Sequence, residues 1–240
     1  MGLSLVIPFY NEDQNINNVV NGLINALEKN VIDYELVLVN NGSTDASPRM
    51  LENLAREKGK GIKVVHVGVN QGYGWGIING LKQANGQFIG YMCGDGQVEP
   101  QSVIELFHCL KGENCDLAKV RRVVRYDGTA REVASAVYNF LFRLMFNVKT
   151  KDVNGSPKIW KGELLKALSP VSKDWFIDAE IMIKAKHLNL KVEEVPVEFS
   201  RREKGRSHVR FTTVLEFAGN MLSQKLAGRA NIWKQNKPKS

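Results

Sequence analysis

Short apolar runs alternate with helical patterns over the first hundred residues, and this alternation constrains the fold more than any other feature. Apolar runs typical of buried strands occupy residues 3–9, 34–39, 63–67 and 88–92. Between the first two runs, apolar residues recur with the i, i+3, i+4, i+7 spacing of a helix that buries one face. Strands that are apolar on both sides and separated by helices predict a mostly parallel central sheet with helices on both faces. We therefore expect a single Rossmann-like α/β domain.

Polar loops follow three of these four strands. Their sequences are YNED at 10–13, NNGSTD at 40–45 and CGDGQ at 93–97. The carboxyl ends of parallel strands lie at one edge of a sheet, and ligands of open α/β sheets bind outside that edge. We therefore expect the three loops to converge on one site.

The second half of the chain has a less regular pattern. It predicts a helix at 101–110, a basic stretch at 119–125, a buried helix at 134–146, an amphipathic helix near 178–188, a strand at 191–199 and an amphipathic segment at 211–226. The apolar segment at 134–146 is too short to span a bilayer, which takes about 20 residues. No other run reaches that length, so we expect no membrane-spanning helix.

The positive charge is concentrated at the C-terminal end. The net charge of the 240 residues is +8, and residues 201–240 hold ten Lys and Arg against two acidic residues, whereas residues 1–200 hold 23 of each sign. Such a segment suits an anionic membrane, a phosphorylated substrate or a nucleic acid. The chain has no recognised nucleic-acid-binding module, so nucleic acid is the least favoured of these partners.

The cysteines and the N-terminus indicate the compartment. The three cysteines are odd in number and have no metal-ligand spacing with the four histidines. This favours a reduced, cytoplasmic compartment. The N-terminal residues carry no basic region of the kind that begins a signal or transit peptide, so we expect none.

Six segments, taken in order, resemble the family 2 glycosyltransferases. They are residues 6–16, 34–47, 70–100, 153–165, 176–199 and 201–207. Within that family, the chain most resembles the branch of dolichyl-phosphate mannose synthase-like enzymes. These enzymes move a sugar from a nucleotide onto a polyprenyl phosphate. Each motif is weak alone, but six in the same order are a strong signal.

The resemblance implies a domain organisation. It implies a GT-A-like catalytic domain at 1–210, with a nucleotide-binding half at about 1–100 and an acceptor half at about 101–210. An amphipathic helix and basic tail at 211–240 follow. These would dock on an anionic membrane at its cytosolic face without crossing it.

The resemblance also implies a nucleoside pocket in the first two loops. Its expected lining is Pro8, Tyr10, Glu12, Asn40, Asn41 and Asp45, and Gly72 and Gly94 are expected to let the backbone approach the donor. The chain departs from the family pattern at two positions, where Asn40 and Asn41 replace aspartates. The alternative is that NNGSTD only turns the chain and caps a helix.

The third loop resembles the family's Asp-x-Asp-x-Gln metal motif, with Cys93 in place of the first aspartate. Mg²⁺ keeps several waters and needs only one or two carboxylates beside the substrate phosphates. We therefore expect Asp95, helped by Gln97, to hold Mg²⁺ or Mn²⁺ against the donor diphosphate. The alternative is that Asp95 is a turn residue beside a degenerate site.

Basic residues in the second half align with family segments that grip phosphates. The candidates are Arg122, Arg131, Arg202, Arg206 and Ser207, whereas Arg121, Arg125 and Arg201 are expected to form a solvated face. Guanidinium groups suit phosphate oxygens because they offer paired, charged donors.

The resemblance implies an inverting, metal-dependent transfer from a nucleotide-diphosphate sugar to a polyprenyl (dolichyl or undecaprenyl) phosphate. A phosphate monoester is largely ionised at neutral pH and can attack the anomeric carbon without a base. Two alternatives stay open: transfer to a saccharide hydroxyl with Asp178 as base, and a decayed binding or scaffold protein. We expect Glu180 to cap or decorate its helix. The donor, the oligomeric state and a separate membrane partner are left open.

Overall fold

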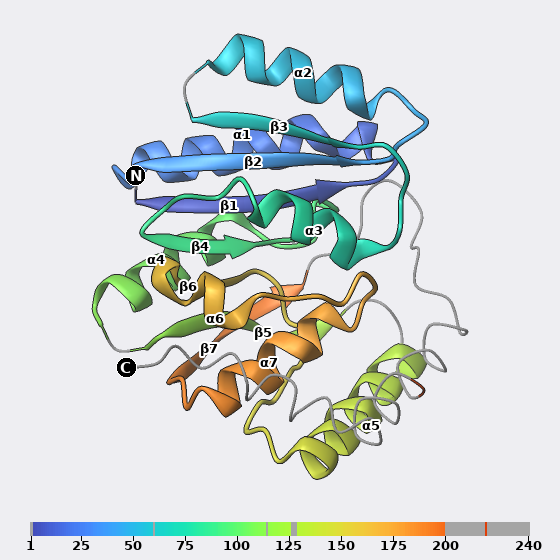
Figure 1. Cartoon of the computed structure of the whole chain (residues 1–240), viewed down its shortest axis with the longest axis vertical. Coiled ribbons are helices and arrows are strands. Elements are labelled where there is room, and N and C mark those ends of the chain that lie inside the picture. Colours follow the sequence, from blue (N-terminus) through green and yellow to red (C-terminus); the bar gives the residue numbers. More distant parts are fainter. Residues whose placement is uncertain (1, 60, 114, 126–128, 200–218, 220–240) are drawn as a thin grey trace.

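A twisted seven-stranded sheet forms the centre of the described part of the molecule (Figure 1). The computed structural model describes residues 2–59, 61–113, 115–125, 129–199 and 219, and their side chains except at 124, 125 and 129–131. The expected segment 211–240, together with Arg202, Arg206 and Ser207, therefore lies outside the description, apart from residue 219.

The first half of the chain alternates strands and helices as predicted. Its elements are β1 (Leu3–Phe9), α1 (Asp13–Lys29), β2 (Tyr34–Asn41), α2 (Ser47–Lys58), β3 (Ile62–Val67), α3 (Tyr73–Leu81), β4 (Phe88–Tyr91) and α4 (Pro100–Lys111). The second half adds β5 (Leu117–Arg125), α5 (Thr129–Phe146), β6 (Lys158–Lys161), the 3₁₀ turn η1 (Gly162–Leu164), α6 (Leu165–Leu168), α7 (Ile177–His187) and β7 (Val192–Phe199).

The order of the strands in the sheet is β3-β2-β1-β4-β6-β5-β7. Strand β1 is parallel to both β2 and β4, and β5 is parallel to β7, whereas β6 runs antiparallel to its neighbours β4 and β5. The expected α/β fold with a mostly parallel sheet is confirmed. Because β1, β2 and β4 are adjacent and parallel, the three polar loops leave the sheet at one edge.

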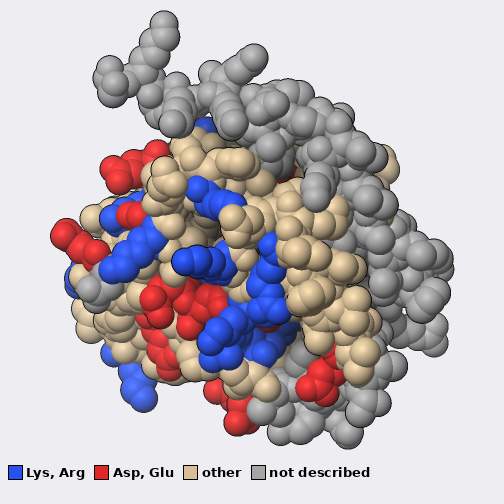
Figure 2. All heavy atoms as spheres, turned by 90° about the horizontal axis from the view of Figure 1, so that it is seen from below, with Lys and Arg blue, Asp and Glu red and all other residues tan. Residues whose placement is uncertain are grey.

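Helix α5 corrects the expectation of a buried helix at 134–146. Tyr138 and Phe142 are buried against α7, but Phe140 and Leu144 are 59% and 70% exposed. The helix is apolar on more than one side and lies beyond α7, outside the sheet, so only one face is covered by described residues (Figure 1). Figure 2 shows the molecule from this side, where uncharged surface adjoins a group of Lys and Arg side chains.

Helix α7 is buried nearly all round, which corrects the expectation of an amphipathic helix there. It lies between the sheet and α5, so that its charged residues Asp178, Glu180 and Lys184 are buried with its apolar ones. The polar positions that suggested a solvent face on this helix instead contact other protein groups.

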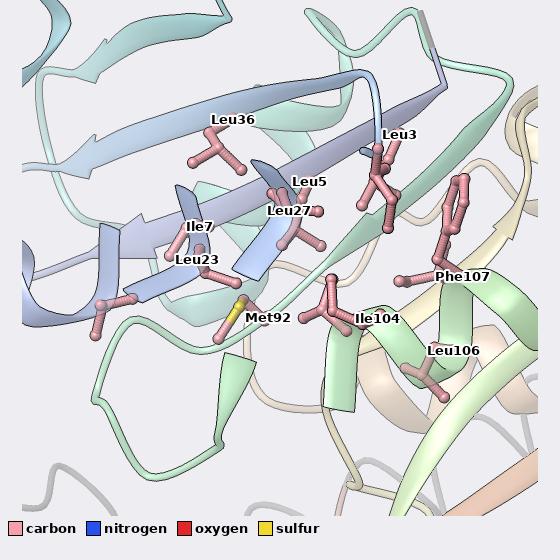
Figure 3. Close-up of a cluster of buried hydrophobic side chains, with 14 of the residues drawn as sticks. Leu3, Leu5, Ile7, Leu23, Leu27, Leu36, Met92, Ile104, Leu106 and Phe107 are labelled. Atoms are coloured by element: carbon pink, nitrogen blue, oxygen red, sulfur yellow. The ribbon is translucent and has the colours of Figure 1, made fainter. Parts of the chain in front are cut away.

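The core has one apolar layer on each face of the sheet and a third cluster between α5 and α7. Helices α1, α2 and α4 cover one face, where Leu23 and Leu27 of α1 gather with Leu5 of β1 and Ile104 of α4 (Figure 3). Helices α3, α6 and α7 cover the other face. Within the described ranges, no helix combines the length and apolar character needed to cross a bilayer.

The turn after α1 contains a strained residue, Val31, and this strain leads to a prediction about stability. Val31 has φ +53° and is 92% exposed. It occupies the left-handed position of a Schellman motif, with bonds from Val31 N to the Glu28 carbonyl (3.0 Å) and from Ile32 N to the Leu27 carbonyl (3.0 Å). Glycine is the usual residue there because a β-branched side chain is strained at positive φ.

We expect Val31→Gly to raise the free energy of unfolding by about 1 kcal/mol in urea denaturation, because it relieves this strain. The control is Val69→Gly, at a residue that is 71% exposed and not at positive φ. That change should leave stability unchanged or lower it. A loss of stability in Val31→Gly would contradict the assignment.

Candidate functional site

The loops after β1 and β2 are joined into one unit by backbone-to-side-chain hydrogen bonds. Asn11 N donates to Ser43 Oγ (3.1 Å), and Glu12 N donates to Ser47 Oγ (3.1 Å). The two loops that were expected to hold a nucleoside therefore lie side by side at the carboxyl edge of the sheet.

Several polar groups of these loops have structural partners. Asp45 Oδ1 accepts a hydrogen bond from Ser47 N (2.9 Å) at the start of α2, and Asn40 Oδ1 accepts one from Ser43 N (2.9 Å). Glu12 is buried and its carboxylate accepts from Asn15 Nδ2 (2.5 Å). Asp45 and Asn40 therefore stabilise turns, as the alternative held, although α2 has no side-chain cap. Their contact with a nucleoside stays a prediction, as does that of Tyr10 and Glu12.

Asn41 retains an open acceptor in this pocket. Its Nδ2 donates to the Gly72 carbonyl (3.0 Å), while its Oδ1 is buried with no hydrogen-bond partner among the described residues. A Cβ placed on Gly76 would lie 3.0 Å from both Asn41 Cγ and Pro8 Cβ. Pro8, Asn41 and the glycine loop therefore meet in one place, where Asn41 Oδ1 is a buried acceptor without a partner among the described residues.

The glycine loop at 70–76 packs closely against the segment before α7. Gly72 has φ +116°, and a Cβ there would lie 2.5 Å from the Lys173 carbonyl oxygen. Trp75 N donates to the same carbonyl (2.9 Å), and the rings of Tyr73 and Trp175 stack with centroids 4.4 Å apart. These glycines let the segment before α7 dock on the loop, and the expected approach of a donor to Gly72 stays a prediction.

The Asp95 loop lies directly against the first loop. A Cβ on Gly94 would be 2.6 Å from the Phe9 ring and 3.0 Å from the Pro8 carbonyl oxygen, so only glycine allows this approach. Asp95 Oδ1 accepts a hydrogen bond from Gln97 N (3.2 Å). The three predicted loops therefore do converge, and Asp95 stands beside the expected nucleoside pocket.

Tyr73 lies near both the Asp95 loop and Asp178 of α7. Burial raises the pKa of the Tyr73 phenol well above its usual value, and nearby Cys93, Asp178 and Asp95 raise it further. The phenol is therefore neutral at physiological pH, and these groups share one neighbourhood.

The donor set at this loop suits a divalent ion that is bound together with a diphosphate. Asp95 supplies a carboxylate and Gln97 an amide oxygen, which are the hard ligands that Mg²⁺ and Mn²⁺ prefer. The described residues contain no group of three His, Cys, Asp or Glu side chains that could enclose a metal by themselves. An ion here would take its remaining ligands from phosphate and water.

Arg122 is engaged in a paired contact with the protein. Its Nε and Nη2 donate to the two carboxylate oxygens of Asp152 at 2.7 and 2.6 Å. Burial raises the pKa of Asp152, but the hydrogen bonds and charge of Arg122 outweigh this effect and hold that pKa well below its usual range. The expected role of Arg122 in phosphate binding stays a prediction. Arg131 lies in the first turn of α5, and its side chain is outside the description.

Asp178 is a buried member of an ion pair. It is 3% exposed, and its Oδ1 accepts hydrogen bonds from Tyr91 Oη (2.6 Å) and from Lys158 Nζ. Burial lowers the pKa of Lys158 to about 8, although Asp178 opposes this shift. The pairing makes Asp178 a poor candidate for a proton acceptor.

Glu180 holds the segment before α7 rather than decorating a surface. Its carboxylate accepts hydrogen bonds from Val171 N (2.9 Å) and Ser172 N (2.7 Å), and it pairs with Lys184 (2.6 Å). The segment that docks on the glycine loop is thereby fixed to α7.

Sequence analysis missed the buried lysines Lys119 and Lys158. Both are fully buried, one in β5 and the other at the start of β6. The sequence did contain a signal for this burial, because alternate residues of a strand share a face. Lys119 lies two residues from Leu117, and Lys158 lies two residues from Trp160, and both of these apolar residues are in the core. Their partners, however, are distant in sequence.

Comparisons with known proteins agree with this geometry. The family model described as Glycosyl transferase family 2 matches residues 4–166. The dodecaprenyl-phosphate galacturonate synthase of Rhizobium johnstonii is 30% identical over 165 residues, which cover 68% of this chain and 49% of that protein. The undecaprenyl-phosphate 4-deoxy-4-formamido-L-arabinose transferase of Proteus mirabilis is 25% identical over 221 residues, or 92% and 67% of the two proteins. The chain thus spans about half of the first relative and two thirds of the second.

Solved structures share the fold. Glucosyl-3-phosphoglycerate synthase from Mycobacterium tuberculosis, in complex with Mn²⁺ and UDP-glucose, matches with a TM-score of 0.73 and 21% identity, covering 94% of this chain and 79% of that one. Its complex with Mn²⁺, UDP and glucosyl-3-phosphoglycerate matches with a TM-score of 0.68 and 22% identity, covering 100% and 81%. At this identity the likeness shows the fold, which is of the GT-A type.

Cys93 stands where the family's metal motif has an aspartate, and restoring that carboxylate gives a testable prediction. Cys93→Asp adds a hard oxygen ligand beside Asp95, and we expect Mn²⁺ to bind about tenfold more tightly in the presence of a nucleoside diphosphate. Isothermal titration calorimetry measures this. The control is Cys93→Ser, which removes the thiol without adding a charge and should bind no more tightly than wild type. Equal affinities of the Asp and Ser variants would contradict a metal site at this loop.

Proposed function

Because the chain belongs to glycosyl transferase family 2, we propose that it transfers a sugar from a nucleoside-diphosphate sugar to a polyprenyl phosphate, with inversion at the anomeric carbon and with a divalent metal. The observation that carries this proposal is the convergence of the Asp95 loop with the Pro8 and Asn41 loops at one edge of the sheet. The two relatives named for polyprenyl phosphates support the acceptor class.

The donor half would bind and orient the nucleotide. Asn41 Oδ1 is a buried acceptor without a partner among the described residues, and it suits an N–H or O–H of a nucleoside. Pro8 and Gly76 shape the wall beside it. Asp95 and Gln97 would hold Mg²⁺ or Mn²⁺, which neutralises charge on the departing diphosphate. The predicted arginines Arg131, Arg202 and Arg206 would add to this stabilisation.

A phosphate acceptor fits the state of Asp178 better than a hydroxyl acceptor does. A hydroxyl needs a base within hydrogen-bond reach, but Asp178 is buried and engaged by Lys158 and Tyr91. A phosphate monoester is already ionised near neutral pH and can attack directly. The two open alternatives, a saccharide acceptor and a decayed scaffold, are outcomes of the assay below.

The assay combines UDP-, GDP- or dTDP-sugars with Mg²⁺ or Mn²⁺ and a polyprenyl phosphate. We expect a glycosylated lipid phosphate with inverted anomeric configuration by NMR, and no product from the matching polyprenol or from free saccharides. Asp95→Asn should lower kcat by about 100-fold or more, since it removes the metal-binding carboxylate. Asp33→Asn, at a residue that bonds Gly2 N at the opposite edge, should not.

Product from a saccharide alone would favour the hydroxyl-acceptor alternative. The absence of both product and nucleotide binding with every donor would favour the scaffold alternative.

We also propose that the outer face of α5 contacts the lipid surface that holds the acceptor. The exposed apolar residues of the helix recur at i, i+4, i+7, i+8 and i+11 and are Val133, Val137, Phe140, Leu141 and Leu144. Arg143, Lys149 and Lys151 are exposed in or just after the helix. Figure 2 shows Lys and Arg side chains beside uncharged surface on this side of the molecule. An apolar stripe flanked by cations is typical of a helix that lies in an anionic membrane interface. The amphipathic and basic segment 211–240 was expected to dock on the same anionic membrane.

Vesicle flotation tests this surface. We expect Phe140→Asp to lower the fraction bound to vesicles of phosphatidylglycerol and phosphatidylcholine at least threefold, because it places a carboxylate in the apolar stripe. The control is Val31→Asp, which changes an exposed valine on another element, at the end of α1. Equal losses in the two variants, or none in Phe140→Asp, would show that α5 does not make the contact.

A further inference from the structure

A row of polar side chains crosses four neighbouring strands at one level of the sheet. Tyr91 of β4 is in register with Lys158 of β6, Lys158 with Lys119 of β5, and Lys119 with Glu194 of β7. Residues in register on paired strands point to the same face. Tyr91 and both lysines have no measurable exposure. Such a row is unusual in the middle of a packed α/β core, where apolar residues are the rule.

The charges of the row are matched by two carboxylates. Lys158 Nζ pairs with Asp178 and donates to the Gly155 carbonyl (2.7 Å), and Lys119 Nζ pairs with Glu194 (3.3 Å). Lys119 also donates to the backbone carbonyl of Asp152. Each buried ammonium therefore has one carboxylate and at least one carbonyl partner.

Stability alone is a weak explanation for this arrangement. The desolvation of two buried ammonium groups offsets much of the Coulombic gain, and apolar residues of similar volume often stabilise a core as well or better. The location of the row offers a better explanation. In the sequence, β4 leads directly into the Asp95 loop, and β7 leads into the segment with Arg202 and Arg206. The row therefore links the two strands that carry the predicted metal-binding and phosphate-binding residues.

We propose that Lys158 is a positioning residue of the transfer reaction: it holds Asp178, and Asp178 in turn holds the Tyr91 hydroxyl at the end of the strand that carries the Asp95 loop. The proposal rests on the proposed function for the nature of the ligand. Tyr91 is followed after three residues by Asp95, so a shift of its ring displaces the loop. Asp178 then serves as an anchor rather than as a proton acceptor.

The surroundings of Lys158 agree with this role. Asp178 of α7 and Asp152 of the loop before β6 favour its charged form, whereas burial and Lys119 of β5 oppose it, and its ammonium lies 5.7 Å from the Tyr91 ring centroid. With its pKa lowered to about 8, the lysine still carries its charge at neutral pH. Asp178 is therefore paired under the conditions in which the transfer would run.

The first test removes only the hydroxyl of Tyr91. The probes are Mn²⁺ with UDP, GDP or dTDP, used separately, and calorimetry measures nucleotide affinity with and without the metal. Tyr91→Phe should weaken Mn²⁺-dependent binding at least fivefold and leave metal-free binding within twofold, while kcat falls and KM for polyprenyl phosphate stays unchanged. The control is Tyr34→Phe, which removes an exposed hydroxyl bonded to Glu28 (3.3 Å) and should change none of these values.

The second test changes the lysine. Lys158→Met is compared with Lys161→Met, on the same strand but with its ammonium partly exposed and paired with Asp116 (2.8 Å). Thermal unfolding reports whether each variant folds. In the double variant Lys158→Met/Asp178→Leu, the unpaired buried charge is removed, so folding should recover. Mn²⁺-dependent binding should not recover, since leucine offers no acceptor to the Tyr91 hydroxyl. Recovery of both would indicate a structural role only and would overturn the proposal.

The outcomes separate this inference from the function on which it rests. A wild-type protein that shows no Mn²⁺-dependent nucleotide binding would overturn the proposed function and the inference together. A wild-type protein that binds, with a folded Tyr91→Phe variant that binds equally well, would overturn the inference alone.

Discussion

The parallel pairing of β1 with β2 on one side and with β4 on the other is the constraint on which the site depends. It brings three polar loops to one edge of the sheet, whatever their separation in sequence. The close approach of Gly94 to Phe9 then sets the depth at which Asp95 stands relative to the first loop. A side chain at residue 94 would clash with Phe9 and shift the Asp95 loop relative to the expected nucleoside pocket. The position of one acid therefore depends on a backbone contact between two strands.

The two halves of the domain are joined at the site by contacts that sequence motifs do not reveal. Glu180 fixes the segment before α7, and that segment docks on the glycine loop through the Lys173 carbonyl. On the other side of Asp95, the Tyr91 hydroxyl ties β4 to Asp178. The loops of the first half are thus supported from the second half, which gives a physical reason for buried carboxylates in a helix that has almost no solvent face.

The predicted site residues fall into groups with different outcomes. Pro8, Asn41 and Asp95 converge as predicted, because their loops follow apolar strands and parallel strands end at one edge of the sheet. Asn40 and Asp45 support turns, and short polar side chains next to a backbone N–H commonly do so. Arg122 is committed to Asp152, thirty residues away in sequence, and no local pattern indicates such a partner. The burial of α5 was misjudged because an apolar helix does not reveal which of its faces another element covers.

The sequence by itself determined the class of fold, the positions of its first four strands along the chain and the family to which the chain belongs. These follow from local hydrophobic periodicity and from motifs read in order. Only the tertiary structure decided that two lysines are buried, that Asp178 is paired and that α5 leaves an apolar face uncovered by described residues. These properties depend on contacts between residues far apart in the chain. A charged side chain is stable in the interior only when the fold brings its partner to it, and that partner is not encoded in its neighbours.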